Sequence, residues 1–354
     1  MPWTHACYAL VLLIALTTTA TAKNSSSGPP QSDGPVIVDI GFLLSNVMEI
    51  SEEQETFDFE GVLSLRWQDP RLAFDPAVTG YDQRYYQGQF QFNEVFDGWW
   101  PQLILANKAG RLERQGVMLR IQPNGVVHYV EEIDASAQSR LNLRRYPFDT
   151  QTFLAIFEVL GFDSSQVQLR MDTGTTGVWT DPLHKVKVPQ WHEPSLNGAV
   201  VEYAPKYMDG HKTPLTAFQV QIEMSRDPWF TLRLVALPVV IFVMLSWSVF
   251  WMDRSSVGDR MDISFIGILT VVAYQIMFSE KLPKISYITV MMSFMIISFV
   301  AMCATVLVNM RVSSLDKLGR FEAGDKVDRV CRYLFPLGYA LAIIVTGGFI
   351  YRSG

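Results

Sequence analysis

The sequence predicts an all-β, immunoglobulin-like sandwich followed by an all-α domain of four transmembrane helices. Two observations predict this division. Residues 36–226 consist of short runs in which apolar and polar residues alternate between turn residues, as is typical of antiparallel sandwiches. Residues 228–352 contain four long apolar segments. A helix needs about 17–25 residues to cross a bilayer, so each segment is interpreted as a span.

The chain begins with the features of a secretory signal. Residues 1–22 hold an apolar core and end in the small residues Ala20-Thr21-Ala22, as signal peptides do before cleavage. An uncleaved anchor is the alternative, although the core is short for a span. Residues 23–35, rich in Ser, Gly and Pro, are predicted to be a flexible lead-in. The sandwich at 36–227 is therefore expected to be extracellular.

Three parts of the extracellular segment illustrate the strand pattern. Residues 57–60 and 62–67 alternate as half-buried strands do. The turn residues Pro123-Asn124-Gly125 separate two apolar runs and predict a hairpin. Residues 218–224 form a last alternating strand that leads directly into the first apolar segment. This segment contains no cysteine, so core packing rather than disulfides must hold the sandwich together.

The four predicted spans cover residues 229–252, 261–278, 287–310 and 333–351 within the helical domain at 228–352. The link at 311–332 is the most basic of the connections between spans. Basic connections stay in the cytoplasm, so this link is expected to be a cytoplasmic loop. The sandwich and the C-terminus are then outside the cytoplasm.

The second span carries a polar-to-apolar stripe. At 100° per residue, one helix face about 80° wide holds Asp262, Ile266, Leu269, Ala273 and Ile276. An unpaired carboxylate that faces lipid is energetically unfavourable. Five such helices around an axis would instead form acidic rings from Asp259 and Asp262 below a leucine constriction, which is how ion pores are built. The alternative is a membrane anchor with an interfacial Asp.

Charge and motifs exclude several classes of function. Residues 23–228 contain 27 acidic and 17 basic residues, so no basic stripe is present for nucleic acid. Acidic walls raise the local cation concentration, which suits a cation mouth. The sequence has no phosphate loop, nucleophile elbow or metal-ligand spacing. We therefore expect neither an enzyme, nor a cofactor, nor a metal site.

Several motifs resemble those of the pentameric ligand-gated ion channels, in particular the prokaryotic members. The segment Arg145–Gln151 resembles the core of the family's signature loop, with Ser139 and Phe153 where disulfide-bearing relatives have cysteines. Further matches follow in the family's order: Trp67-Gln68-Asp69, Trp99-Trp100-Pro101, Arg226, Leu282-Pro283 and Phe335-Pro336.

The resemblance implies a homopentamer with the second span as pore lining. Gly258-Asp259-Arg260 resembles the place where cation-selective members have an acidic residue followed by a basic one, whereas anion-selective members resemble Pro-Ala-Arg. Permeant monovalent cations and membrane lipid are the implied partners, and a bacterial inner membrane is the implied location. Gating is expected to be coupled through an Arg–carboxylate pair and its surroundings: Tyr146, Pro147, Phe148, Asp149, Arg226 and Pro283.

The resemblance places an agonist site between subunits, in an aromatic box with a polar group. Glu158 and Phe162 follow the signature loop, and Tyr203 and Tyr207 flank a hairpin that resembles the capping loop. A carboxylate with aromatic rings suits a cationic amine. Protons are the alternative stimulus, since His128 and other histidines lie outside. The alternative function is a membrane-anchored extracellular sensor that does not conduct.

Overall fold

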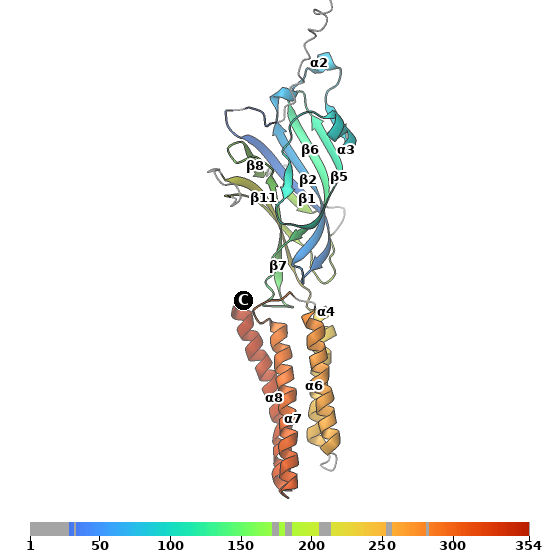
Figure 1. Cartoon of the computed structure of the whole chain (residues 1–354), viewed down its shortest axis with the longest axis vertical. Coiled ribbons are helices and arrows are strands. Elements are labelled where there is room, and N and C mark those ends of the chain that lie inside the picture. The colour runs from blue at the N-terminus through green and yellow to red at the C-terminus, as the bar shows by residue number, and fades with distance from the viewer. Residues whose placement is uncertain are drawn as a thin grey trace, which may run out of the picture.

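The computed structural model describes residues 28–31, 33–171, 177–180, 186–204, 214–252, 257–280 and 283–353. A β-sandwich stands above a layer of long helices (Figure 1), so the predicted fold class is confirmed. The strands are β1 (Val36–Ser51), β2 (Thr56–Gln68), β3 (Arg84–Gln87), β4 (Leu103–Leu105), β5 (Lys108–Ile121), β6 (Val126–Gln138), β7 (Thr150–Val159), β8 (Val167–Met171), β9 (Val178–Thr180), β10 (Ser195–Tyr203) and β11 (Leu215–Ser225).

The strands form two sheets whose inner faces meet. One sheet runs β3-β5-β6-β2-β1-β8, with β9 also paired to β1, and the other runs β10-β11-β7-β4. Alternation along β2 and β7 places Phe57, Phe59, Phe153 and Phe157 in the core. Gly61 lies where a Cβ atom would approach the Phe42 ring to 2.3 Å, so the sheet needs glycine there.

The predicted hairpin joins β5 and β6, and Gly125 in its turn has a φ of 81°. Gly tolerates this left-handed conformation without steric cost. Short helical pieces accompany the sheets, with α2 at the top of Figure 1 and α3 beside β5: Pro70–Leu72, α2 (Pro76–Thr79), α3 (Gly88–Phe90) and Gln91–Val95. The last strand, β11, ends at Ser225 and the first helix begins at Trp229. The sandwich therefore continues into the helical domain through only three residues.

Among the described residues, four helices are long and apolar enough to cross a membrane: Trp229–Trp251, Gly258–Ser279, Val290–Lys317 and Phe321–Arg352. The first is built from α4 (Trp229–Thr231), a wide turn at Leu232–Ala236, α5 (Leu237–Trp247) and a tight turn at Ser248–Trp251. The wide turn directly precedes Pro238, the proline at the start of α5. Such turns accommodate the hydrogen bond that proline cannot donate. The others are α6 (Val257–Ser279), α7 (Val290–Lys317) and α8 (Phe321–Ser353).

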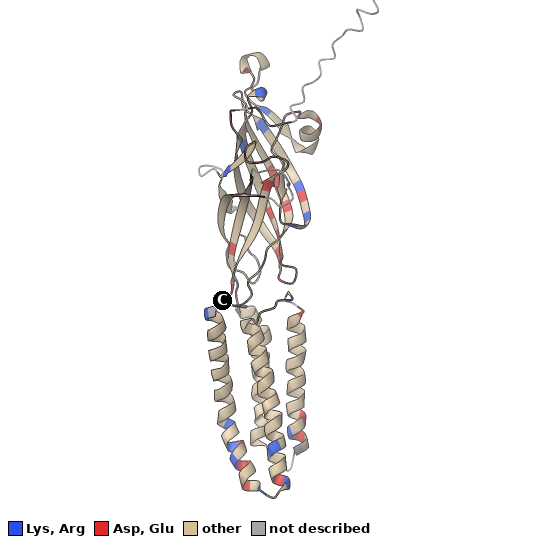
Figure 2. Cartoon of the chain, turned by 60° about the vertical axis from the view of Figure 1, so that its left-hand side comes forward, with Lys and Arg blue, Asp and Glu red and all other residues tan. Residues whose placement is uncertain are grey.

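The prediction of a loop at 311–332 is wrong, because most of this segment is helical. Helix α7 continues to Lys317, α8 begins at Phe321, and Gly319 makes the turn with a φ of 71°. Lysine and arginine are good helix formers, so basic residues extend a helix beyond its apolar segment. Within the helices, Figure 2 shows the charged residues mostly at the ends farthest from the sandwich, which we call the inner end.

Candidate functional site

Helix α6 has one covered face and one uncovered face. The side chains of Arg260, Ser264, Val271 and Phe278 are buried against neighbouring elements of the same chain. The five residues of the predicted stripe, and Asp259 before it, are all exposed in the single chain: Asp259, Asp262, Ile266, Leu269, Ala273 and Ile276. Leu269, midway along the stripe, is 71% exposed. An apolar face with acids at one end is therefore available for contact with water or with further copies of the chain.

Close packing against α7 fixes which face of α6 is covered. A Cβ atom at Gly267 would lie 2.4 Å from the methyl carbon of Met302 on α7. Three residues earlier, Ser264 accepts a hydrogen bond from Asn309 Nδ2 at 3.0 Å. Because small residues allow close helix contact, Gly267 and Ser264 turn the opposite face of α6 outward.

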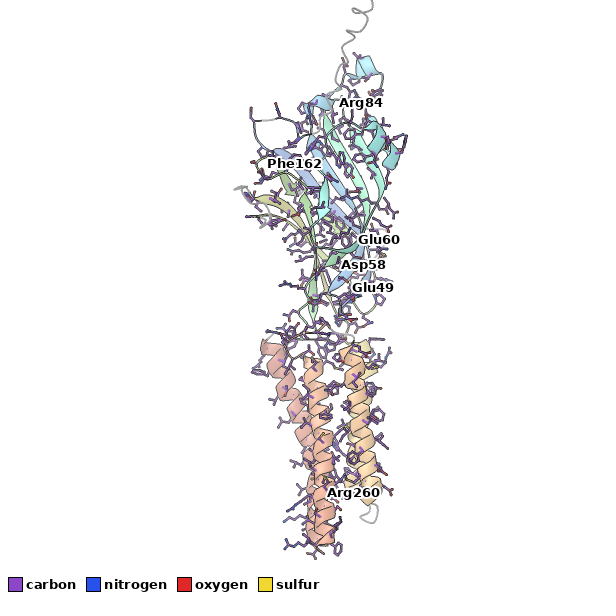
Figure 3. All side chains as sticks on the ribbon, viewed as in Figure 1. Glu49, Asp58, Glu60, Arg84, Phe162 and Arg260 are labelled. Atoms are coloured by element: carbon purple, nitrogen blue, oxygen red, sulfur yellow. The ribbon has the colours of Figure 1, made fainter. Side chains whose placement is uncertain are left out.

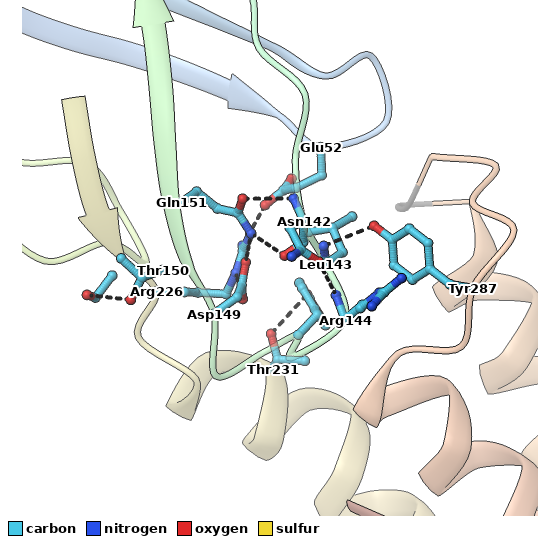
Figure 4. Close-up of polar contacts among 12 residues, drawn as sticks. Glu52, Asn142, Leu143, Arg144, Asp149, Thr150, Gln151, Arg226, Thr231 and Tyr287 are labelled. Atoms are coloured by element: carbon cyan, nitrogen blue, oxygen red, sulfur yellow. Dashed lines mark hydrogen bonds and ion pairs between the residues drawn. The ribbon is translucent and has the colours of Figure 1, made fainter. Parts of the chain in front are cut away.

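The loop between β6 and β7 lies on the outer ends of the helices (Figure 4). At the start of α7, Val290 N donates to Arg144 O at 3.0 Å and Met291 N donates to Tyr146 O at 3.3 Å. The Tyr287 hydroxyl accepts from Leu143 N at 3.1 Å. The loop therefore binds the helical domain through backbone groups, whose positions do not depend on side-chain rotamers.

Tyr146, one of the predicted coupling residues, contacts three of the four membrane helices. Its ring packs on Phe278 of α6 with centroids 5.7 Å apart, and its hydroxyl lies 3.2 Å from Thr231 Oγ1 of α4. Its carbonyl accepts from Met291 of α7. Burial raises the pKa of Tyr146 above its ordinary value, so the hydroxyl stays protonated and can donate.

Arg226 lies just before the first helix and is the charged centre of this junction. Its Nε donates to Asp149 Oδ1 at 3.0 Å and its Nη1 to Glu52 Oε1 at 2.6 Å. The guanidinium also stacks on Trp191 and Tyr146, at 4.2 and 4.7 Å from their ring centroids. The predicted Arg–carboxylate pair is thus present, and Glu52 is a second acid that the sequence did not indicate.

The electrostatics hold this arginine permanently charged. Burial alone lowers the pKa of Arg226, but the carboxylates of Asp149 and Glu52 outweigh burial, so the pKa lies above its ordinary value. Gln151 Nε2 donates to the second oxygen of Asp149 at 2.5 Å. One cation therefore faces two carboxylates, and the side chain of Asp149 is almost fully enclosed.

A cavity of about 470 Å³ opens beside this cluster between the two domains. Glu52 and Trp191 line it from the sandwich, while Thr231 and Phe278 line it from the helices. Since both domains contribute walls, a movement of one against the other changes the shape of this space. Junction residues that sequence reasoning missed are Glu52, Trp191, Thr231, Phe278 and Tyr287; none of them belongs to a motif visible in the sequence. Gln151 ends the signature-loop motif, but its hydrogen bond to Asp149 was not predicted.

The remaining predicted coupling residues take no part in the ion pair. Pro147 is buried within the loop, whereas Phe148 is 46% exposed. Pro283 lines a different cavity, of about 450 Å³, with Ile276 of α6 and Met295 of α7. The structure thus brings Tyr146, Asp149 and Arg226 together and places Pro283 between α6 and α7.

Three of the predicted agonist residues, Glu158, Phe162 and Tyr203, lie in the sandwich, where Figure 3 labels Phe162. Glu158 on β7 and Tyr203 on β10 pair with Ala217 and Leu215 of β11. Because partners opposite each other share a sheet face, Glu158 and Tyr203 are on the same face with one strand between them. Glu158 is 5% exposed.

The aromatic part of the expected box is only partly assembled by one chain. The Phe162 ring meets Trp99 edge-on, with centroids 6.0 Å apart. Tyr207 lies outside the described residues. Trp99 was noted in the sequence only as part of a motif, yet its ring is 4% exposed and supports Phe162.

Comparison with known protein families gives two matches. The model of the neurotransmitter-gated ion-channel ligand binding domain matches residues 16–228. The model of the neurotransmitter-gated ion-channel transmembrane region matches residues 235–320. The boundary between the two matches coincides with the junction around Arg226.

The names of individual relatives give different stimuli, and one of them names chloride as its ion. The proton-gated ion channel of Gloeobacter violaceus is 27% identical over 325 residues, which is 90% of this chain and 85% of the relative. The glutamate-gated chloride channel of Drosophila melanogaster is 24% identical over 75% of this chain. The gamma-aminobutyric acid receptor subunit rho-1 of Rattus norvegicus is 25% identical over 88%. The chain spans 56% and 64% of the length of these last two.

Proposed function

Because this chain belongs to the neurotransmitter-gated ion-channel family, we propose that it assembles as a homopentameric, cation-selective channel opened by an extracellular stimulus. The uncovered face of α6 is the observation that carries this proposal. Asp259 and Asp262 end that face, and Ile266, Leu269 and Ile276 continue it. Carboxylate rings attract cations, and an apolar constriction closes a pore by excluding water.

The proposed location is a bacterial inner membrane, with the sandwich and the C-terminus outside the cytoplasm. The charge pattern supports this orientation, since basic residues gather at the inner end of the helices (Figure 2) and cytoplasmic segments carry an excess of Lys and Arg. Channel-forming relatives in the same family support conduction over the alternative of a non-conducting sensor.

Selectivity is tested by currents across a planar bilayer that contains the purified protein. In a salt gradient, the wild type should reverse near the cation equilibrium potential. Asp259→Asn and Asp262→Asn should move the reversal potential towards the anion value, with the largest change in the double variant. Asp325→Asn, which removes an exposed acid from α8, is the matched control. A wild type that reverses at the anion potential contradicts cation selectivity, and a silent protein supports the sensor.

Leu269 is proposed as the closed gate, because it is the bulkiest apolar residue midway along the stripe. Leu269→Ser would allow water to wet the constriction, giving leak current or raised agonist sensitivity. Leu334→Ser on α8, at a site 59% exposed, makes the same change outside the α6 face. A well-expressed but insensitive Leu269→Ser channel would move the gate, with Ile276 the next candidate.

The agonist is proposed to bind between subunits at Glu158, Phe162, Tyr203 and Tyr207, and protons are the second candidate stimulus. The shared sheet face of Glu158 and Tyr203 supports a common site. Losing an aromatic of a desolvated cage removes about 1–2 kcal/mol, roughly 5–30-fold in affinity. Glu158→Gln and Tyr203→Ala should raise the effective concentration by that factor and leave single-channel conductance unchanged. Overlapping dose–response curves would place the site elsewhere.

Coupling between stimulus and pore is proposed to pass through the junction of Tyr146, Pro147, Phe148, Asp149, Arg226 and Pro283. Its support is geometric, because Tyr146 contacts α4, α6 and α7 while Arg226 holds the sandwich next to the first helix. A displaced signature loop would therefore move the outer end of α6.

A further inference from the structure

A buried polar cluster joins α6, α7 and α8 at the inner end of the helices. It consists of Arg260, Ser264, Asn309 and Asp328, all 6% exposed or less, and we call it the inner network. Figure 3 labels Arg260 close to the inner end. The guanidinium binds Asp328 in a fork: Nη2 donates to Oδ1 at 3.0 Å and Nη1 donates to Oδ2 at 3.3 Å.

The inner network closes on itself. Arg260 Nη2 also donates to Asn309 Oδ1 at 3.1 Å, and Asn309 Nδ2 donates to Ser264 Oγ at 3.0 Å. The Ser264 hydroxyl donates to the carbonyl of Arg260 at 2.9 Å. A planar guanidinium bound in a fork has little freedom to reorient. Arg260 is therefore held in one direction, towards α7 and α8.

That direction is away from the acids next to it in the sequence. Asp259 and Asp262 are exposed on the uncovered face of α6, whereas Arg260 is buried on the covered face. Arg260 forms an ion pair with Asp328 of α8, 68 residues further along the chain. The positive charge of Arg260 is thus balanced on the covered side of α6, by Asp328 of a different helix.

We propose that Asp328 is a specificity-determining residue of the ion pathway, although it lies on α8 and not on the exposed face of α6. By balancing Arg260, it leaves the field at the inner mouth to Asp259 and Asp262. Without it, each subunit of a pentamer would place an uncompensated positive charge directly behind the acidic rings. In low-dielectric surroundings, the charge of Arg260 acts on ions that pass the acidic rings. This inference rests on the proposed role of α6 as pore wall.

The first test is Asp328→Asn, which removes the charge and keeps the shape. Single-channel conductance and the cation-to-anion permeability ratio should each fall roughly 2- to 5-fold. Asp325→Asn, three residues earlier on α8 and exposed, should change neither. Equal values for the two variants would overturn the proposal.

Two further variants keep the proposal testable even if Asp328→Asn folds poorly. The double variant Arg260→Gln with Asp328→Asn removes both charges and should return the permeability ratio towards that of the wild type. Asn309→Asp adds a second carboxylate beside Arg260 and should raise cation conductance. A double variant as impaired as Asp328→Asn alone, or an Asn309→Asp channel with lower cation conductance, would contradict the proposal.

The experiments distinguish a failure of this inference from a failure of the proposed function. A wild type that is silent or anion-selective contradicts the proposed cation channel. A cation-selective wild type whose inner-network variants all conduct like Asp325→Asn contradicts only the role of Asp328.

Discussion

Buried arginines connect the parts of this molecule at both ends of the helical domain, but their partners differ. Arg226 at the outer end faces the carboxylates Asp149 and Glu52, two aromatic rings and a cavity of about 470 Å³. Arg260 at the inner end faces one carboxylate, Asp328, and the amide of Asn309.

The difference separates a connection that can rearrange from one that is fixed. At the outer end, Glu52 is 25% exposed and borders the cavity, so it can exchange its bond to Arg226 for water. At the inner end, the hydrogen bonds of the inner network join buried groups to one another. Outer-end substitutions are therefore expected to affect activation, and inner-end substitutions to affect permeation.

Among substitutions at the two ends, Arg226→Gln is expected to have the largest effect. Removing one partner of a buried ion pair costs about 3–5 kcal/mol, because the other charge is left uncompensated. We expect a large fall in the melting temperature of the detergent-solubilised protein and loss of the response to stimulus. Arg226→Lys keeps the positive charge but lacks the planar guanidinium that binds both carboxylates. Its melting temperature and response should lie between those of Arg226→Gln and the wild type. Melting and activation like those of the wild type would show that this pair does not connect the two domains.

The two acids of the outer cluster should differ in their effects. The Asp149 side chain is 2% exposed and that of Glu52 is 25% exposed. Asp149→Asn should cost about 2–4 kcal/mol, and Glu52→Gln about 1 kcal/mol or less, since partly exposed pairs are screened. Thermal melting of both variants side by side measures the order, and a larger effect of Glu52→Gln would reverse our interpretation.

Tyr287→Phe is expected to have a smaller effect. Its hydroxyl accepts from Leu143 N and donates to Leu141 O at 3.4 Å. Such bonds contribute about 1 kcal/mol, so the effective agonist concentration should shift by roughly 5-fold or less at unchanged conductance. Tyr333→Phe, on an exposed face of α8, is the control and should match the wild type. Altered conductance in Tyr287→Phe would conflict with an outer-end role in activation.

The smallest predicted effect is a pH dependence in the sandwich. Burial, with smaller contributions from Arg120 and Arg66, lowers the pKa of His128 below its usual 6.5. The stability that neutral His128 contributes is present above pH 6.5 and is lost as the pH falls through the lowered value. His128→Gln should therefore retain a melting temperature about 1–3 °C above that of the wild type at pH 5, and equal it at pH 8.

The control for this pH experiment is His192→Gln, because His192 is exposed. It should follow the wild type across the whole range. If His128→Gln loses stability on acidification as steeply as the wild type, other groups govern the pH dependence.

The sequence predicted the division into sandwich and helices because alternation and long apolar runs are local patterns. The face of α6 was equally readable, since its acids and aliphatic residues repeat at helical spacing. The ends of α7 and α8 were not predicted, because charged residues continue a helix without extending its apolar run. The pairing of Arg226 with Asp149 was indicated only by a family resemblance.

The inner network and the agonist site show where sequence reasoning stops. Arg260 and Asp328 are 68 residues apart, and no local pattern marks an aspartate in a basic segment as the partner of a distant arginine. The register of β7, β10 and β11 places Glu158 and Tyr203 on one sheet face, which requires long-range pairing. A site between subunits further depends on surfaces that a single sequence does not position.

The uncovered face of α6 also affects how the protein is made. A newly inserted subunit alone in a bilayer turns Asp259 and Asp262 towards lipid and headgroups. An acidic side chain at the centre of a membrane helix costs about 2.5–3.5 kcal/mol during insertion, and less near the interface. Association with other copies would return these carboxylates to water, so the acids that we propose to attract cations would also make the solitary subunit a short-lived intermediate of biosynthesis.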